Sequence, residues 1–313
     1  METILHAIEE KQALLEQTSD YIWENPETAF TEYKSAACLC DVLRKEGFTV
    51  EENLAGIQTA FSGRFGSGKP VIGILGEFDA LSGLSQMAGV AEQISAGGEA
   101  GHGCGHNLLS VGALGAAIGV KAWLEKTGKP GTVIYFGCPG EEGGSGKAFM
   151  ARDGVFDELD AAITWHPSDG NRVLNKRWLG NYQVLYKFDG KASHAAGAPE
   201  LGLNALAAVN LLFAAVNAFR EQVPEDSRMH GIITDGGEAP NITPSRAACR
   251  FFLRSTSEEW IKKIEKRFLD IVHGAELMTG TTAEVTPFNV PYMSRTPNAA
   301  LNRVYIESMT ELG

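Results

Sequence analysis

Three hydrophobic segments of the sequence each end in polar side chains that could bind a metal ion. We predict buried strands at residues 71–77, 132–139 and 161–165. The polar residues that follow them are Asp79, the pair Glu141-Glu142, and His166. In an open α/β sheet, parallel strands deliver such side chains to a crevice at their carboxyl ends. Because imidazole and carboxylate groups are ordinary ligands of divalent metals, their convergence there predicts a metal site.

A Cys104-Gly105-His106 triplet lies between the first and second of these strands. A thiolate and an imidazole two residues apart can reach the same ion if the backbone bends, and glycine permits the bend. Two other interpretations stay open. Cys104 can be an inert, buried thiol in a glycine-rich turn, or a nucleophile with His106 as its base. The nucleophile interpretation leaves the glutamate pair without a role, so we favour the metal ligand.

Glu141 and Glu142 follow a strand that is apolar throughout. Two adjacent ionised carboxylates repel each other. The simplest assignment is that one binds the metal and the other accepts a proton. A solvated pair of loop charges is the alternative. The Gly146-Lys147 dipeptide nearby does not complete a phosphate-binding loop, because that motif needs a glycine at 141 and Ser or Thr at 148.

Each of the remaining candidate residues has two possible roles when only the sequence is considered. His166 is either a core histidine or a ligand, and its position at a strand end favours the ligand. Asp79 is either a ligand or a carboxylate that orients a histidine. His194, in the segment Lys191-Ala192-Ser193-His194, is either a turn residue or a group that reaches a substrate oxygen.

The order of predicted elements indicates an α/β fold, in which helices cover both faces of a mostly parallel sheet. Helices are expected at 4–23, 31–46 and 108–125, the last with Asn107 as its N-cap. We assign residues 1–178 to the first part of a metal-binding domain. Residues 179–290 read as β-α-β-β-α-β, the order of an inserted ferredoxin-like domain. Residues 291–313 begin a helix that returns to the first domain.

Composition excludes several classes of protein. A net charge of −12 argues against a nucleic-acid partner, which would need clustered Lys and Arg. The five cysteines have no spacing typical of a disulfide framework, so we expect a reducing, cytoplasmic setting. The first residues lack the features of a signal peptide, and no run of about eighteen apolar residues predicts a membrane span.

At six places the sequence resembles the aminoacylase and zinc carboxypeptidase clan of metallopeptidases. The resemblance is to its amidohydrolase branch, which contains the p-aminobenzoyl-glutamate hydrolases and related dipeptidases. The matching segments occur in the order found in that clan. They are GEFDAL (76–81), HGCGHN (102–107), PGEEGG (139–144), WHP (165–167), KASHAA (191–196) and APNITP (239–244).

The resemblance implies a two-metal catalytic domain interrupted by a lid domain that forms a homodimer. Such an enzyme hydrolyses the amide bond of an N-acyl amino acid or dipeptide-like substrate through a water molecule activated between two ions. Zinc is the favoured ion because a thiolate is a soft ligand, and manganese is the alternative. A non-catalytic relative that binds metal and serves only for association is the competing hypothesis.

Residue by residue, the resemblance assigns the following roles. The metal ligands are Cys104, His106, Glu142 and His166, and the general base is Glu141. Asp79 supports the ligands, and His194 and Asn241 contact the substrate.

Two departures from the clan pattern stand out. Asn107 replaces the usual aspartate after His106. Members of the clan also supply a last histidine ligand after the lid domain, and no such residue follows within these 313 residues. We therefore expect either that the C-terminal part of the catalytic domain is missing from this sequence or that the protein has lost that ligand.

Overall fold

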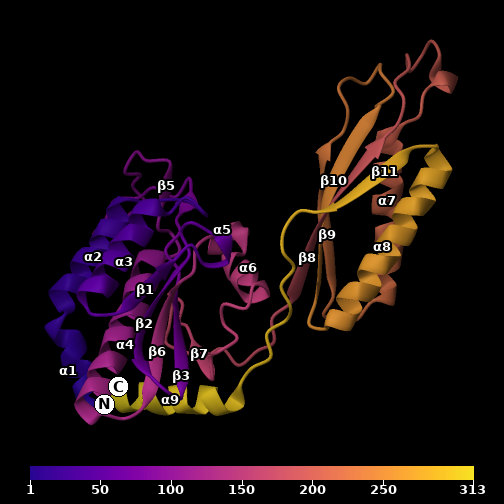
Figure 1. Cartoon of the computed structure of the whole chain (residues 1–313). Helices are drawn as coiled ribbons and strands as arrows, with labels where there is room; N and C mark the ends of the chain where they lie inside the picture. The colour runs from indigo at the N-terminus through magenta and orange to yellow at the C-terminus, as the bar shows by residue number, and fades with distance from the viewer. The chain divides into compact units, whose positions relative to one another are not determined.

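The computed structural model describes residues 1–313 and divides them into two units, residues 1–170 and 171–313 (Figure 1). Each unit has its own sheet and its own hydrophobic core. The sequence predicts three segments with boundaries after residues 178 and 290. These two boundaries stay predictions.

A five-stranded sheet with the order β1-β2-β6-β3-β7 forms the centre of the first unit. Its parallel part consists of β6 (Gly131–Gly137), β3 (Val71–Gly76) and β7 (Ala161–Ile163). On the other side of β6, the strands β2 (Phe61–Ser67) and β1 (Thr49–Glu52) are antiparallel. The α/β class is confirmed, and the predicted metal residues follow the three parallel strands.

The register of β3 and β6 brings two of the predicted strand ends to the same level. Gly76 pairs with Gly137, the last residue of each strand, so both chains leave the sheet side by side. Every residue of β6 is buried, as expected for a strand covered on both faces. The residues that follow these strands therefore start from one edge of the sheet.

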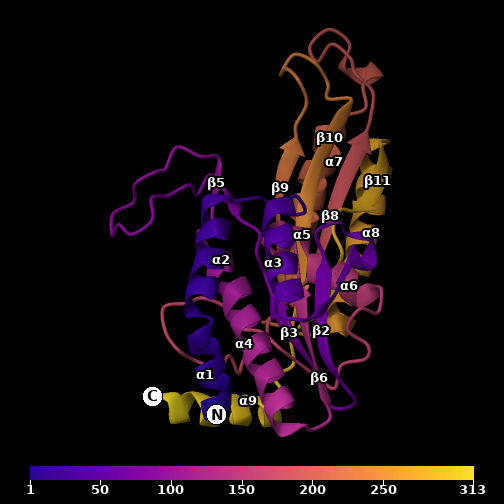
Figure 2. The same ribbon diagram turned by 60° about the vertical axis from the view of Figure 1, so that its left-hand side comes forward.

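Helices and a short irregular segment cover the two faces of this sheet. One face packs against α2 (Gln12–Glu24), α3 (Tyr33–Lys45) and α4 (His106–Thr127) (Figure 2). The other face packs against α6 (Gly146–Arg152) and the turn that follows it, with Met150 and Phe156 in contact with β6.

α4 is the central helix of the first unit. Its length of 22 residues and mean hydropathy of 1.4 would suit a membrane span, but 61% of that window is buried inside the fold. α1 (Glu2–Glu10) crosses it closely at Gly119, where an added Cβ would lie 2.7 Å from Ile4. The predicted helix over residues 4–23 is thus two helices, α1 and α2, which break at Lys11.

The predicted N-cap of α4 is wrong. The helix begins at His106 with Gly105 as its N-cap residue, in the left-handed conformation at φ +73°. Asn107 lies in the first turn, where its side-chain amide donates to the Ser19 hydroxyl at 3.0 Å. A glycine is favoured at position 105 because other residues rarely adopt this conformation.

The second unit contains an antiparallel sheet with the order β11-β8-β10-β9. Its elements in chain order are β8 (Gly180–Asp189), α7 (Ala205–Phe219), β9 (Arg228–Asp235), β10 (Arg246–Ser255), α8 (Glu258–Thr279) and β11 (Thr282–Pro287). Side chains of α7 and α8 form one core with the sheet. This strand order confirms the predicted ferredoxin-like topology. Helix α9 (Ala299–Leu312) ends the chain.

Candidate metal centre

The carboxyl ends of the three parallel strands bring one group of side chains together. Asp79 follows β3, the pair Glu141-Glu142 follows β6, and His166 follows β7. Cys104 and His106 come from the turn before α4 and from its first residue. The shared sheet edge explains why residues so far apart in sequence meet.

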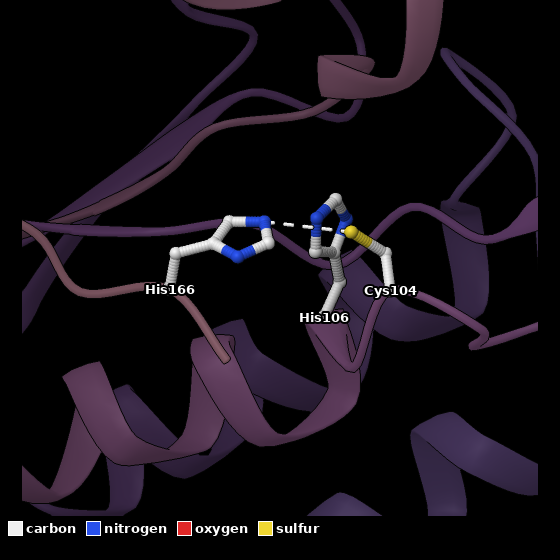
Figure 3. Close-up of side chains that lie close together, drawn as sticks. All are labelled: Cys104, His106 and His166. Atoms are coloured by element: carbon white, nitrogen blue, oxygen red, sulfur yellow. Dashed lines mark hydrogen bonds between the residues drawn. The ribbon is translucent and has the colours of Figure 1, made fainter. Parts of the chain in front are cut away.

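Cys104, His106 and His166 form a compact set of donors (Figure 3). The Cys104 Sγ lies 3.4 Å from His166 Nε2, and the two imidazole rings meet edge to face at 5.6 Å between centroids. Two such ligands on one tetrahedral zinc ion would have Sγ and N about 3.5 Å apart, given Zn–S and Zn–N bonds of about 2.3 and 2.0 Å. His166 Nδ1 donates to the Pro167 carbonyl at 2.8 Å, which leaves the Nε2 lone pair facing the thiol.

His106 is held in the orientation that a metal ligand needs. Its Nδ1 donates to Asp79, with the side-chain Oδ1 at 3.1 Å and the main-chain oxygen at 3.0 Å. The proton therefore sits on Nδ1, and Nε2 presents its lone pair. That Nε2 atom is buried and has no hydrogen-bond partner. A histidine held by a carboxylate on one nitrogen and open on the other is the usual arrangement of a metal-bound imidazole.

Asp79 links both sides of the centre. Besides His106, it accepts a hydrogen bond from the Glu142 main-chain amide at 2.8 Å. Burial alone would raise the pKa of Asp79, but the bonds from His106 and Glu142 outweigh it and lower the pKa. The carboxylate is thus ionised, and it fixes a histidine and the glutamate turn at once. Its role as a support for the ligands stays a prediction.

Glu141 and Glu142 point to different parts of the centre. Glu142 hydrogen-bonds with the Cys104 thiol, and burial together with this contact raises the pKa of Cys104 to about 12 in the metal-free protein. The Oε1 atom of Glu142 is buried and has no hydrogen-bond partner. Glu141 is 40% exposed, and its Oε2 lies 3.9 Å from His106 Nε2. Burial, followed by the charge of Glu77, raises the pKa of Glu141.

Sequence reasoning missed two residues of this centre, Glu77 and Lys147. Glu77 Oε1 pairs with Lys147 Nζ at 2.5 Å, and its Oε2 lies 3.2 Å from His106 Nε2. One signal was available, because an ionisable residue that directly follows a buried strand needs a partner. Lys147 gives no such signal, because its partner Glu77 is 70 residues away in sequence.

The donor set fits divalent metal ions. Two groups of donor atoms each lie within 4.8 Å of one another, namely Cys104 with His106 and His166, and Glu77 with His106 and Glu141. Three buried donor atoms have no hydrogen-bond partner: Glu77 Oε2, His106 Nε2 and Glu142 Oε1. Thiolate and imidazole suit zinc, and the carboxylates also suit manganese.

His194 and Asn241 belong to the second unit. They lie on adjacent segments, since His194 forms a β-bridge with Ile242 and the Ala195 amide donates to the Asn241 carbonyl at 3.0 Å. His194 Nδ1 accepts from the amides of Ala196 and Gly197 at 3.2 and 3.0 Å. Both His194 and Asn241 are exposed, and their contact with substrate stays a prediction.

Residues 180–276 match the family model described as a peptidase dimerisation domain. The chain is 32% identical over 323 residues to the Xaa-Arg dipeptidase of Homo sapiens, a match that covers 98% of this chain and 70% of that protein. The chain belongs to the M20 family of peptidases. The recognition made from the six motifs is thereby confirmed.

Two further relatives extend this result. One polypeptide of the p-aminobenzoyl-glutamate hydrolase of Escherichia coli is 46% identical over 309 residues, and the match spans 98% of this chain but only 64% of that protein's length. Among solved structures, a dinuclear metal-binding peptidase of the M20 family from Bacillus subtilis superposes with a TM-score of 0.67 at 18% identity, covering 96% of this chain and 81% of that one. The structural likeness confirms the fold.

Proposed function

We propose that this M20 family member is a metal-dependent amidohydrolase that cleaves the amide bond of N-acyl amino acids or dipeptide-like substrates. The observation that carries the proposal is His106, whose Nδ1 is held by Asp79 while its buried Nε2 lies open beside Cys104 and His166. The names of two relatives, p-aminobenzoyl-glutamate hydrolase and Xaa-Arg dipeptidase, support a substrate in which an amino acid is joined through an amide.

Two divalent ions are proposed as cofactors, with zinc favoured and manganese as the alternative. Cys104, His106, Glu142 and His166 are the proposed ligands. Bound ions would lower the pKa of a water molecule and polarise the amide carbonyl. The excess of carboxylates around His106 supports this proposal, because their negative charge needs a cation close by.

The proposed chemistry of the chain's own residues centres on Glu141. Its carboxylate takes a proton from the attacking water and returns it to the amine that leaves. A raised pKa suits this role, since a base works best when its pKa lies near the working pH. His194 would donate to the oxygen that gains charge during attack, and Asn241 would position the substrate.

An activity assay tests the proposal directly. The purified protein, loaded with zinc or with manganese, is offered a panel of N-acyl amino acids, dipeptides and p-aminobenzoyl-glutamate. We expect release of the free amino acid from at least one member, measured by a ninhydrin or chromatographic assay, and its loss when a chelator removes the metal. Full metal content without turnover on any member would favour the non-catalytic alternative.

We also propose a homodimer formed through the second unit. Strand β9 is an edge of its sheet and carries two exposed isoleucines, Ile232 at 65% and Ile233 at 45%. An exposed, apolar edge strand is suited to pair with another chain. The match of this region to a dimerisation domain supports the same partner.

Sedimentation velocity tests this assembly. At micromolar concentration we expect a mass of about twice the 33.6 kDa of one chain. Ile232→Lys should shift the protein toward monomer, because a lysine on an edge strand opposes strand pairing. Leu277→Lys is a matched control, since Leu277 is 73% exposed on α8, which leads into the opposite edge of the sheet. A monomeric wild-type protein would contradict the proposal.

A cytoplasmic setting and a small-molecule substrate are also proposed. All five cysteines are free, which supports a reducing cytoplasmic setting. The acidic charge supports a small-molecule substrate over a nucleic acid.

A further inference from the structure

Glu77 is a buried carboxylate with one oxygen that lacks a partner. It directly follows β3 and is 6% exposed. Lys147 Nζ holds Oε1 at 2.5 Å, while Oε2 is buried and accepts no hydrogen bond. A buried, ionised oxygen without a partner is costly in free energy, so Oε2 needs a cation or a donor close to it.

The atom that Oε2 faces cannot satisfy it as a neutral imidazole. His106 Nε2 lies 3.2 Å away, is itself buried, and also has no hydrogen-bond partner. Because Nδ1 carries the proton that goes to Asp79, Nε2 presents a lone pair to Oε2. Two lone pairs in this position repel each other unless a metal ion or a proton lies between them.

The distance between these two atoms is the one expected for neighbouring ligands. An imidazole nitrogen and a carboxylate oxygen on one tetrahedral zinc ion lie about 3.3 Å apart, given bonds of about 2.0–2.1 Å. The observed 3.2 Å agrees with that value. Glu141 Oε2 is farther from the same nitrogen, at 3.9 Å, and its side chain is 40% exposed. It is therefore less well placed than Glu77 Oε2 to share an ion with His106.

We infer that Glu77 is a ligand of the ion that His106 binds, and that Lys147 is the counter-ion that holds Oε1 and turns Oε2 toward this ion. The inference rests on the proposed function, because it requires that metal ions occupy the centre. It adds a residue that the six matching motifs did not assign to the metal.

This assignment also separates the ligands of two ions. An imidazole nitrogen has one lone pair and binds one ion, so His106 cannot serve both donor groups that contain it. With Glu77 beside His106, the thiol of Cys104, His166 and Glu142 remain for the second ion. Glu141 belongs to the same donor group as Glu77 and His106, but its side chain is 40% exposed, and it keeps its proposed role in proton transfer.

Metal stoichiometry tests the inference without any measurement of activity. Wild-type protein and the Glu77→Gln variant are dialysed against buffered zinc and analysed by mass spectrometry for bound metal, and their cobalt(II) forms are compared by visible absorption. We expect two ions per wild-type chain. Glu77→Gln should lose one ion, with a fall in affinity larger than the roughly 10–100-fold typical when an outer partner of a ligand is removed. The cobalt bands of that ion should disappear.

Lys147→Met should have the smaller effect. It keeps the ligand and removes only its counter-ion, so we expect a loss of affinity of about 10–100-fold with two ions still bound at high metal concentration. Asp160→Asn is the matched control. Asp160 forms a similar pair with Lys69 at 2.7 Å and accepts from Val71 at the other end of β3, and its loss should leave both ions in place.

These measurements distinguish a failure of the Glu77 assignment from a failure of the proposed function. Two ions with unchanged affinity and unchanged cobalt bands in Glu77→Gln would overturn the inference and leave the metal centre intact. A wild-type protein that binds no ion would overturn the proposed function itself. If Glu77→Gln fails to fold, the double variant Glu77→Gln/Lys147→Met removes both charges of the pair, and it should fold and bind one ion.

Discussion

Replacing Glu141 with glutamine should lower turnover by about 10²–10⁴-fold, the usual contribution of general acid–base catalysis, while the protein keeps its metal. Glutamine has nearly the same shape as glutamate but cannot accept the proton from the attacking water. Because Glu141 is 40% exposed and lies 3.9 Å from His106 Nε2, its loss should disturb neither the ligands nor the fold. The measurement is steady-state kinetics on the best substrate, with metal content determined on the same sample.

Glu142→Gln is the matched control for this result. Glu142 contacts Cys104 and carries a buried oxygen without a partner, so we expect it to lose metal, and turnover only as a consequence. Added zinc should therefore restore activity partly in Glu142→Gln and not at all in Glu141→Gln. Metal loss from Glu141→Gln with full retention in Glu142→Gln would mean that the two glutamates have each other's roles.

His106→Ala should remove bound metal and turnover together, and should also destabilise the metal-free protein. The side chain of His106 is fully buried against Asp79, which is equally buried and negatively charged. Removing His106 takes a hydrogen-bond donor from this buried carboxylate, which should cost about 1.5–3 kcal/mol, the usual value for a hydrogen bond to a charged group. Urea unfolding of metal-free samples, followed by circular dichroism, measures this loss in the free energy of unfolding.

His6→Ala provides the comparison for this stability effect. His6 is 72% exposed and pairs only with Glu10 along the same helix, so its removal should change stability by less than about 0.5 kcal/mol. An equal stability for metal-free His106→Ala and wild-type protein would show that the interaction with Asp79 contributes nothing to the fold. Retention of metal by His106→Ala would remove His106 from the set of ligands.

Much of the fold could be predicted because the apolar segments are long and their ends are distinct. The order of strand-like and helix-like hydrophobic segments in residues 180–287 was sufficient to predict the ferredoxin-like topology. The pairing of β8 with β10 and β11 confirms this prediction. β2 was missed because Phe61–Ser67 contains two glycines, two serines and an arginine and has no clear hydrophobic period. The break at Lys11 was missed because α1 and α2 continue the same apolar spacing across it.

The candidate centre was predictable where the residue type itself indicates the chemistry. Cys104, His106 and His166 meet as the strand-end argument requires. Glu77 and Lys147 were not found, because a pair that joins two distant segments leaves no local pattern. The cap at Asn107 was wrong for a related reason: its partner, Ser19, is on α2, and the sequence does not show that contact.

The sheet of the first unit must form before its candidate metal ligands can meet. Cys104 and His166 are 62 residues apart in sequence, and they meet only after β7 has paired with β3. An unfolded chain therefore offers no preformed site, and the proposed ions would bind almost entirely to the native state. By mass action, free zinc at 100 times its dissociation constant would add about 2.7 kcal/mol to stability for each ion. If the bound ions are zinc, its availability would thus influence how much of this protein stays folded.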